Sequence, residues 1–334
     1  MKTKKEFMSK THICSLVCAA IAGATTFAAP LDRSKVAEEA KWVVHLDFDA
    51  FRKTAVGSQL TEKVLQPKLA ETEAEMKFDL SLDFKNISSL TAYGPSFQKE
   101  GDGVLILSTT ADVKKDLDTL VGMAALSDAE EKDVTMVQQK PYLLYNLKGS
   151  VFIAPNVGGS VLVAKSKEQI ERGREVIEGR VPSLAKSALF KDYPEVADTF
   201  FFLGMAEGFN AAKNIPPQAQ VLRETEGGRL VLGEKDKNLF VNLVFKGKNE
   251  ESSLKIQQIL QGLCALVSIS QQNEDLTELL SQTKIASAGR NVSVDLRFPA
   301  AHVVEKILEK HGHGEHDQDE NEEEIVDEKK ETGN

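Results

Sequence analysis

The stretch that decides the fold is Lys41-Trp42-Val43-Val44-His45-Leu46-Asp47-Phe48-Asp49-Ala50-Phe51. Apolar and mostly polar residues alternate from Trp42 to Asp49, and a period of two predicts a half-buried strand with one apolar and one solvated face. Asp49 stands where the alternation ends, so we expect its carboxylate to cap a following helix by accepting from free backbone N–H groups. The stretch therefore predicts a strand that runs directly into a helix, which ends near Pro67.

A second stretch of the same kind reads Asp198-Thr199-Phe200-Phe201-Phe202-Leu203-Gly204-Met205-Ala206-Glu207-Gly208-Phe209. The elements predicted around the two stretches correspond: a strand and helix at 42–66 and 199–213, then two strands and a helix at 87–126 and 229–268, and again at 151–179 and 285–310. Each half has about the order βα-ββα-ββα, which is typical of an α+β fold with helices on one face of a mainly antiparallel sheet. We expect two similar halves, at residues 29–190 and 191–310.

Short-range signals set several boundaries inside these halves. Ser166 and Gln169 form a capping box, which predicts the start of a helix. Gly227-Gly228 predicts a hairpin turn between strands at 219–224 and 229–232. Pro299 is expected in the first turn of the last helix, and a short helix is predicted over 276–280.

The N-terminus has the pattern of a secretory signal peptide at residues 1–28. Lysines precede an apolar run at 13–22, and Thr26-Phe27-Ala28 offers small residues before a cleavage point. The apolar run is too short to cross a bilayer, so we expect no membrane span in the mature chain. Cleavage would remove Cys14 and Cys18 and leave Cys264 alone, which excludes an internal disulfide. The predicted location is periplasmic or secreted.

The connector Pro182-Ser183-Leu184-Ala185-Lys186, which leads to Thr199-Phe200-Phe201-Phe202, resembles a loosely defined group of exported bacterial proteins. These proteins are uncharacterised and are built from repeated α+β units that each open on an apolar strand. The resemblance covers most of the mature chain and implies no activity.

The net charge of the chain limits the kinds of partner that it can bind. The formal net charge of the 334 residues is -10, and an acidic protein repels nucleic acid and anionic membrane surfaces. Residues 311–334 are rich in Asp and Glu and poor in aliphatic residues, so we expect a disordered acidic tail. Imidazole and carboxylate groups in this tail suggest a weak site for a divalent metal, formed by His311, His313, His316 and Asp317.

Within the folded part, His45, Asp47 and Asp49 share one face of the predicted strand at i, i+2 and i+4. Such a set could hold a metal ion or provide an acid–base pair. The alternative interpretation is a solvated strand face with a helix cap. No Gly-x-Ser-x-Gly elbow, His-Glu-x-x-His motif or Gly-rich phosphate loop occurs in the sequence.

These observations favour an exported, non-enzymatic binding or scaffold protein of the cell envelope over an enzyme. Its partner would be an envelope ligand or protein that the sequence does not identify, and the surface between the halves is the expected place for it. No cofactor is predicted beyond weak metal binding at the tail. Two alternatives stay open: a metal-dependent enzyme that uses the strand face of His45 and Asp47, and a metal-binding function of the tail.

Overall fold

The computed structural model describes residues 30–76, 83–97, 101–126, 134–139, 142–196, 198–208, 224–269, 280 and 282–314. The predicted signal peptide, nearly all of the strand predicted at 219–224, most of the helix predicted at 276–280, and the tail from residue 315 lie outside the described residues. Among the described residues, no helix is both long and apolar enough to cross a membrane.

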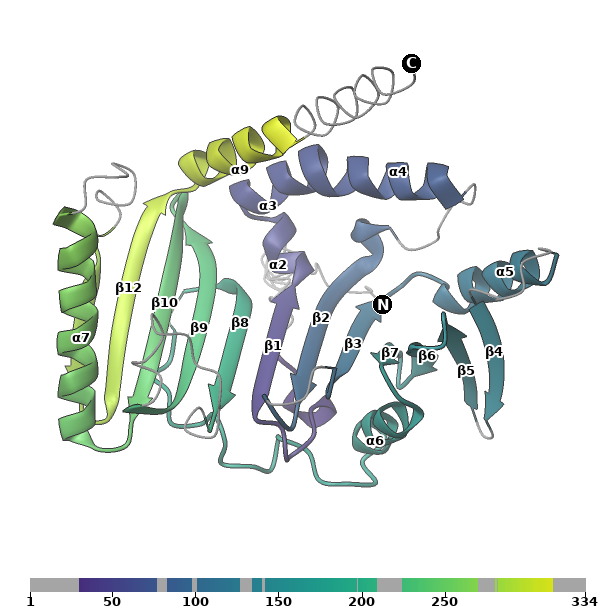
Figure 1. Ribbon diagram of the computed structural model, residues 1–334, viewed down its shortest axis with the longest axis horizontal. Coiled ribbons are helices and arrows are strands. Elements are labelled where there is room, and N and C mark those ends of the chain that lie inside the picture. The colour runs from purple at the N-terminus through teal and green to yellow at the C-terminus, as the bar shows by residue number, and fades with distance from the viewer. Residues whose placement is uncertain are drawn as a thin grey trace, which may run out of the picture.

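The described strands form one antiparallel sheet of twelve strands (Figure 1). From one edge to the other, the order is β11 (Lys284–Ala288), β12 (Asn291–Pro299), β10 (Asn238–Gly247), β9 (Thr225–Lys235), β8 (Phe200–Glu207), β1 (Trp42–Asp47), β2 (Ile87–Gly94), β3 (Val104–Thr109), β7 (Ser160–Ala164), β6 (Val151–Val157), β5 (Tyr142–Leu147) and β4 (Val134–Gln139). The helices accompany this sheet without alternating with parallel strands, so the predicted α+β class is confirmed.

The two stretches that the sequence analysis compared are neighbours at the centre of the sheet. β1 and β8 pair antiparallel, with Trp42 opposite Ala206 and Leu46 opposite Phe202. All described strands before residue 190 lie on the β1 side of this pair, and all those after it lie on the β8 side. That the two halves superpose in three dimensions stays a prediction.

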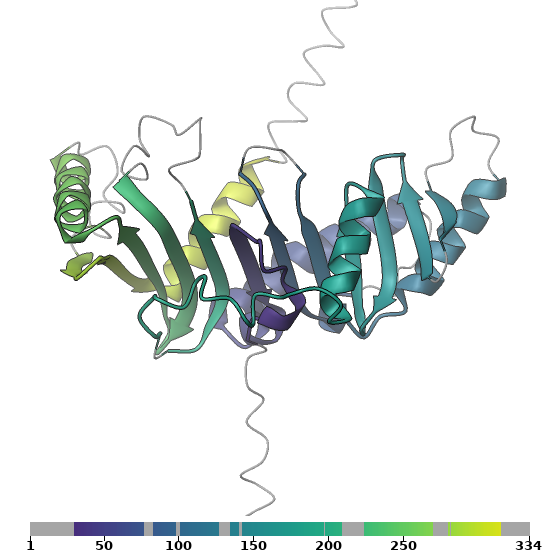
Figure 2. The same ribbon diagram turned by 90° about the horizontal axis from the view of Figure 1, so that it is seen from below.

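Helices cover both faces of the sheet. They are α2 (Phe48–Arg52), α3 (Ala55–Leu60), α4 (Gln66–Met76), α5 (Val113–Leu126), α6 (Lys167–Ile177), α7 (Glu250–Ile269) and α9 (Ala300–Gly314), with 3-10 turns η1 (Arg33–Lys35) and η3 (Phe84–Asn86). Within β5, Tyr142 and Tyr145 point to opposite faces because they are three residues apart. Tyr142 stacks on Arg174 of α6, whereas the Tyr145 hydroxyl donates to Asp118 of α5. Helix α6 therefore lies on the opposite face of the sheet from α5. The sequence had predicted all helices on one face, and α6 departs from that prediction. In Figure 2 the long axis of the molecule runs horizontally, with α7 at one end of the sheet and α5 at the other.

The sequence predicted one helix after β1 that ends near Pro67, but α2 already ends at Arg52, and the helix that begins with α3 continues past Pro67. A π-helical turn, η2 (Thr61–Leu65), leads directly into α4, and the Gln66 N–H donates to the Thr61 carbonyl. Pro67 has no N–H, and in a regular α-helix its ring would crowd the carbonyl of Lys63. The wider π turn just before the proline gives the ring room and lets the helix continue.

The predicted hairpin at Gly227-Gly228 is wrong, because both glycines lie inside β9. The chain turns from β9 to β10 at Asp236 and Lys237, which have positive φ values of 52° and 62°. A Cβ on Gly227 would lie 2.6 Å from the Ala206 carbonyl oxygen and 2.8 Å from Tyr193 Oη. A glycine is therefore needed here for close packing within the sheet.

Candidate functional site

The polar face of β1 is buried, which corrects the interpretation of a solvated strand face. His45 is 3% exposed and Asp47 is 2% exposed, whereas Trp42, Val44 and Leu46 on the other face are partly exposed. Two segments that are distant in the sequence pack against this face, and the periodicity of the strand does not reveal them. Residues 36–40 join the connector, with the Leu184 N–H donating to the Val36 carbonyl at 2.8 Å, and both segments belong to the same core as Val43 of β1.

The three candidate residues His45, Asp47 and Asp49 do not form one site. His45 Nδ1 lies 2.9 Å from Thr91 Oγ1 on the neighbouring β2. Asp47, not Asp49, caps α2, because its Oδ1 accepts from the Ala50 N–H at 2.8 Å. Asp49 lies in the first turn of α2 and forms an ion pair with Arg52. Within the described ranges, no three His, Cys, Asp or Glu residues gather in a way that could hold a metal ion.

Only part of the metal site predicted in the tail lies within the described residues. Helix α9 extends to Gly314, past the predicted boundary at residue 310, and so includes His311 and His313 in its last turn. His316 and Asp317 lie outside the described residues.

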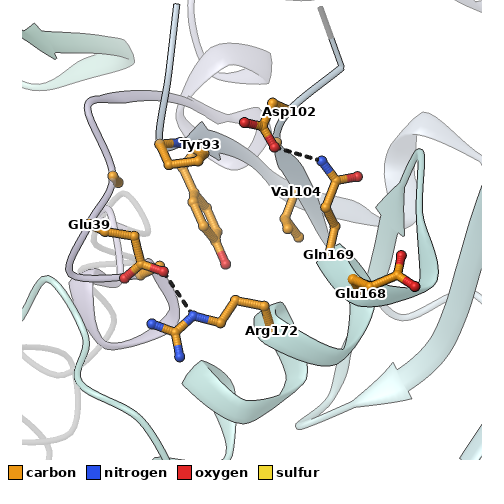
Figure 3. Close-up of a pocket in the computed structure, with 11 residues that line it drawn as sticks. Glu39, Tyr93, Asp102, Val104, Glu168, Gln169 and Arg172 are labelled. Carbon is orange, nitrogen blue, oxygen red and sulfur yellow. Dashed lines mark hydrogen bonds and ion pairs between the residues drawn. The ribbon is translucent and has the colours of Figure 1, made fainter. Parts of the chain in front are cut away.

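A cavity of about 200 Å³ opens between residues 37–40, the β2–β3 hairpin and the first turns of α6 (Figure 3). Its wall is mainly apolar and includes Ala37, Ala40, Pro95 and Val104. The elements that surround it come from three distant parts of the chain. We call it the Tyr93 pocket, after the polar side chain that reaches its interior.

Tyr93 lies near the end of β2 and is 3% exposed, yet its hydroxyl forms no hydrogen bond within the described structure. In Figure 3 the hydroxyl points into the space between Glu39, Arg172 and Gln169. Burial raises the pKa of Tyr93 well above its usual range, and the nearby charge of Glu39 raises it further. The group is therefore a protonated hydroxyl at neutral pH, with one hydrogen to donate and lone pairs to accept.

An ion pair stands at the mouth of the pocket. Arg172 Nε on α6 donates to Glu39 Oε1 at 2.8 Å, with the two side chains 41% and 43% exposed. This hydrogen bond is the main reason that the pKa of Arg172 is raised. Burial on its own would raise the pKa of Glu39, but the hydrogen bonds from Arg172 and the backbone outweigh it and hold that pKa below its usual range. Both groups therefore stay charged near neutral pH and tie the N-terminal segment to α6.

Gln169 fixes the opposite wall of the pocket. It completes the capping box of α6 that the sequence predicted, since its Oε1 accepts from the Ser166 N–H at 3.1 Å and its N–H donates to Ser166 Oγ at 3.2 Å. Its Nε2 also donates to the Gly101 carbonyl at 2.9 Å and to Asp102 Oδ1 at 3.2 Å. One side chain thus starts the helix and attaches it to the β2–β3 hairpin.

No pattern in the sequence indicates the Tyr93 pocket. Glu39, Tyr93 and Arg172 are far apart in the chain, and none belongs to a motif with a fixed spacing. The one local signal was the capping box, which located the start of α6 but not the surface that it faces.

Comparison with known proteins adds only distant likenesses. No protein-family model and no curated protein matches the chain. Among solved structures, crystal form III of TP0453 aligns with a TM-score of 0.46 and 10% identity, over 82% of this chain and 96% of that chain. Crystal form I of TP0453 aligns with a TM-score of 0.44 and 11% identity, over 84% of this chain and 97% of that chain. At this distance, the site must be judged on its own geometry.

Proposed function

We propose that the protein is a binding protein that holds a small, mainly apolar molecule in the Tyr93 pocket. One observation carries this proposal: the Tyr93 side chain lines the cavity, and its buried hydroxyl has no hydrogen-bond partner within the described structure. Leaving such a group unpaired costs about 1–3 kcal/mol. A ligand with one polar atom next to the hydroxyl would offset this cost, while its apolar body would contact Ala37, Ala40 and Val104.

The size of the pocket limits the ligand. A dry cavity of about 150 Å³ holds benzene, and this pocket has about 200 Å³. We therefore expect a ligand of roughly six to ten non-hydrogen atoms. Such pockets commonly combine an apolar wall with a few polar groups that orient the ligand, and here the polar group in the interior is Tyr93.

The chemistry of Tyr93 supports binding rather than catalysis. Because burial and Glu39 raise the pKa of its hydroxyl, the group does not release its proton near neutral pH. It is therefore a poor general base, since an efficient base has a pKa close to the working pH. What remains available is hydrogen bonding, which positions a ligand.

The test uses benzyl alcohol as the probe, titrated into the full protein and followed by NMR. We expect a dissociation constant of about 1 mM, since eight non-hydrogen atoms at roughly 0.5 kcal/mol each give about 4 kcal/mol. Tyr93→Phe removes the hydroxyl and keeps the ring, so binding should weaken about five- to tenfold, as expected for one lost hydrogen bond.

Tyr193→Phe is the matched control. Tyr193 is 8% exposed and its hydroxyl also has no hydrogen-bond partner among the described residues, but it lies outside the pocket. This variant should bind benzyl alcohol as the original protein does. Equal binding by the Tyr93→Phe variant, or no binding by the original protein, would refute the proposal.

We also propose that the protein is exported to the cell envelope. The lysine-rich start, the apolar run at 13–22 and the small residues up to Ala28 support this proposal. N-terminal sequencing of the protein from fractionated cells tests it. We expect the mature chain to begin near Ala29 and to be recovered from the envelope or the medium; an uncleaved chain in the cytoplasmic fraction would contradict export.

A further inference from the structure

We infer that the Tyr93 pocket selects a positively charged ligand, a small organic ammonium compound, over a carboxylate of the same size. This inference rests on the proposed binding function and specifies the chemical class of the ligand. Two independent observations meet in the pocket: a buried hydroxyl that has no hydrogen-bond partner among the described residues, and an excess of carboxylates in the wall.

The charged groups of the wall are Glu39, Asp102 and Glu168 against the single guanidinium of Arg172. The Arg172 charge is already balanced by Glu39 through their hydrogen bond at the mouth. Asp102 accepts from the neutral amide of Gln169, which does not balance its charge. Each carboxylate in the wall lowers the potential in the pocket.

Glu168 adds a further carboxylate to the wall, in the first turn of α6. Hydrogen bonds from the backbone and from Ser166 lower its pKa, so it stays ionised near neutral pH. The charge of the adjacent Lys167 makes the smallest contribution to lowering that pKa. The Lys167 ammonium lies over the Phe152 ring, 5.8 Å from the ring centroid. Lys165, the other cation nearby, packs over Gly101 outside the lining of the pocket.

The interior of the pocket also suits an ammonium group. The Tyr93 oxygen has lone pairs that can accept a hydrogen bond from N–H. Its ring presents an aromatic wall, and aromatic faces attract cations. A carboxylate ligand would instead be repelled by Asp102 and Glu168 and would have to compete with Glu39 for Arg172.

The experiment compares benzylamine, benzyl alcohol and benzoate, which share one ring and differ in charge at neutral pH. Each is titrated into the full protein at low salt and followed by NMR. We expect benzylamine to bind about tenfold more tightly than benzoate, with benzyl alcohol between them, and the difference to shrink at high salt.

Two single variants assign the effect to the pocket. Glu168→Gln and Asp102→Asn should each weaken benzylamine about threefold more than they weaken benzyl alcohol, since the amide of Asn can still accept from Gln169. Glu251→Gln on the exposed start of α7 is the matched control and should change neither. Benzoate binding as tightly as benzylamine, or benzylamine binding that both pocket variants leave unchanged, would overturn the inference while the proposed binding function stands. Failure of all three compounds to bind would overturn both.

Discussion

Asp47 Oδ1 accepts a hydrogen bond from the Ala50 N–H at 2.8 Å, so the last residue of β1 is also the cap of α2. The same carboxylate is 2% exposed, and its other oxygen has no hydrogen-bond partner among the described residues. The cap is therefore a buried group at the centre of the sheet, where β1 pairs with β2 and β8.

Replacing Asp47 tests the importance of this cap. Asp47→Ala removes the acceptor and should lower the free energy of unfolding by about 1–2 kcal/mol. Asp47→Asn keeps a side-chain oxygen for the Ala50 N–H and should cost less. Urea unfolding followed by circular dichroism measures both values.

Asp49→Ala is the control for this prediction. Asp49 was expected to be the cap, but its carboxylate instead pairs with Arg52 on a partly exposed part of α2. A partly exposed ion pair is worth at most about 1 kcal/mol. If Asp49→Ala destabilises the protein more than Asp47→Ala does, the assignment of the cap is wrong.

Asp47 and Asp49 also show what the sequence could predict. The period of two located β1, and the break in it placed the start of a helix within a residue or two, because both signals depend on neighbouring residues. The face of β1 that is buried could not be read from the period. Its cover comes from residues 36–40 and the connector around Leu184, which are brought together only in the folded chain.

The Tyr93 pocket was beyond sequence reasoning for the same reason. Gln169 was found as part of a capping box, since that motif spans only four residues. Its second role, the hydrogen bond to the Gly101 carbonyl, joins α6 to a hairpin far away in the sequence. The hydrogen bond between Arg172 and Glu39 likewise joins two segments that are far apart in the sequence.

The tyrosines predict how stability depends on pH. Burial, followed by its hydrogen bond to Glu171, raises the pKa of Tyr142 from 10.0 to about 12. A raised pKa means that the folded state holds the proton more tightly than the unfolded state does. The stabilisation is complete below about pH 10 and is lost as the pH rises towards about 12. We expect the free energy of unfolding to fall across this range.

The measurement is urea unfolding at a series of alkaline pH values, with Tyr142→Phe as the test variant. Phenylalanine has no proton to lose, so the fall in stability over this range should be shallower for the variant. Identical slopes for the two proteins would show that Tyr142 does not contribute to the alkaline loss.

Metal binding by the tail is tested on the full chain. Calorimetric titration with Ni²⁺ should show weak binding that a variant with His311, His313 and His316 all changed to Gln reduces at least tenfold, because imidazole is a preferred ligand of this ion. The matched control is His302→Gln in α9, outside the tail, which should bind as the original protein does. Unchanged binding by the triple variant would contradict a tail site.

Gly227 gives a prediction about packing in the second half of the sheet. Gly227→Ala would place a methyl group 2.6 Å from the Ala206 carbonyl oxygen and 2.8 Å from Tyr193 Oη. Overpacking of this kind costs about 1–3 kcal/mol, and the backbone oxygen cannot move away without disturbing the pairing of β8 with β9. Thermal unfolding should show a clearly lower midpoint for this variant.

Two further variants separate crowding from the loss of glycine itself. Gly262 lies within α7 and a Cβ there would meet nothing within 4 Å, so Gly262→Ala should stabilise the protein by about 0.5–1 kcal/mol through helix propensity. In the Tyr193→Phe background, the Tyr193 oxygen is absent and the contacts with the Ala206 carbonyl oxygen and Glu207 Cγ remain, so Gly227→Ala should cost less there than in the original protein. If its cost is the same in both backgrounds, Tyr193 is not the reason that position 227 needs a glycine, and the contacts with Ala206 and Glu207 account for it.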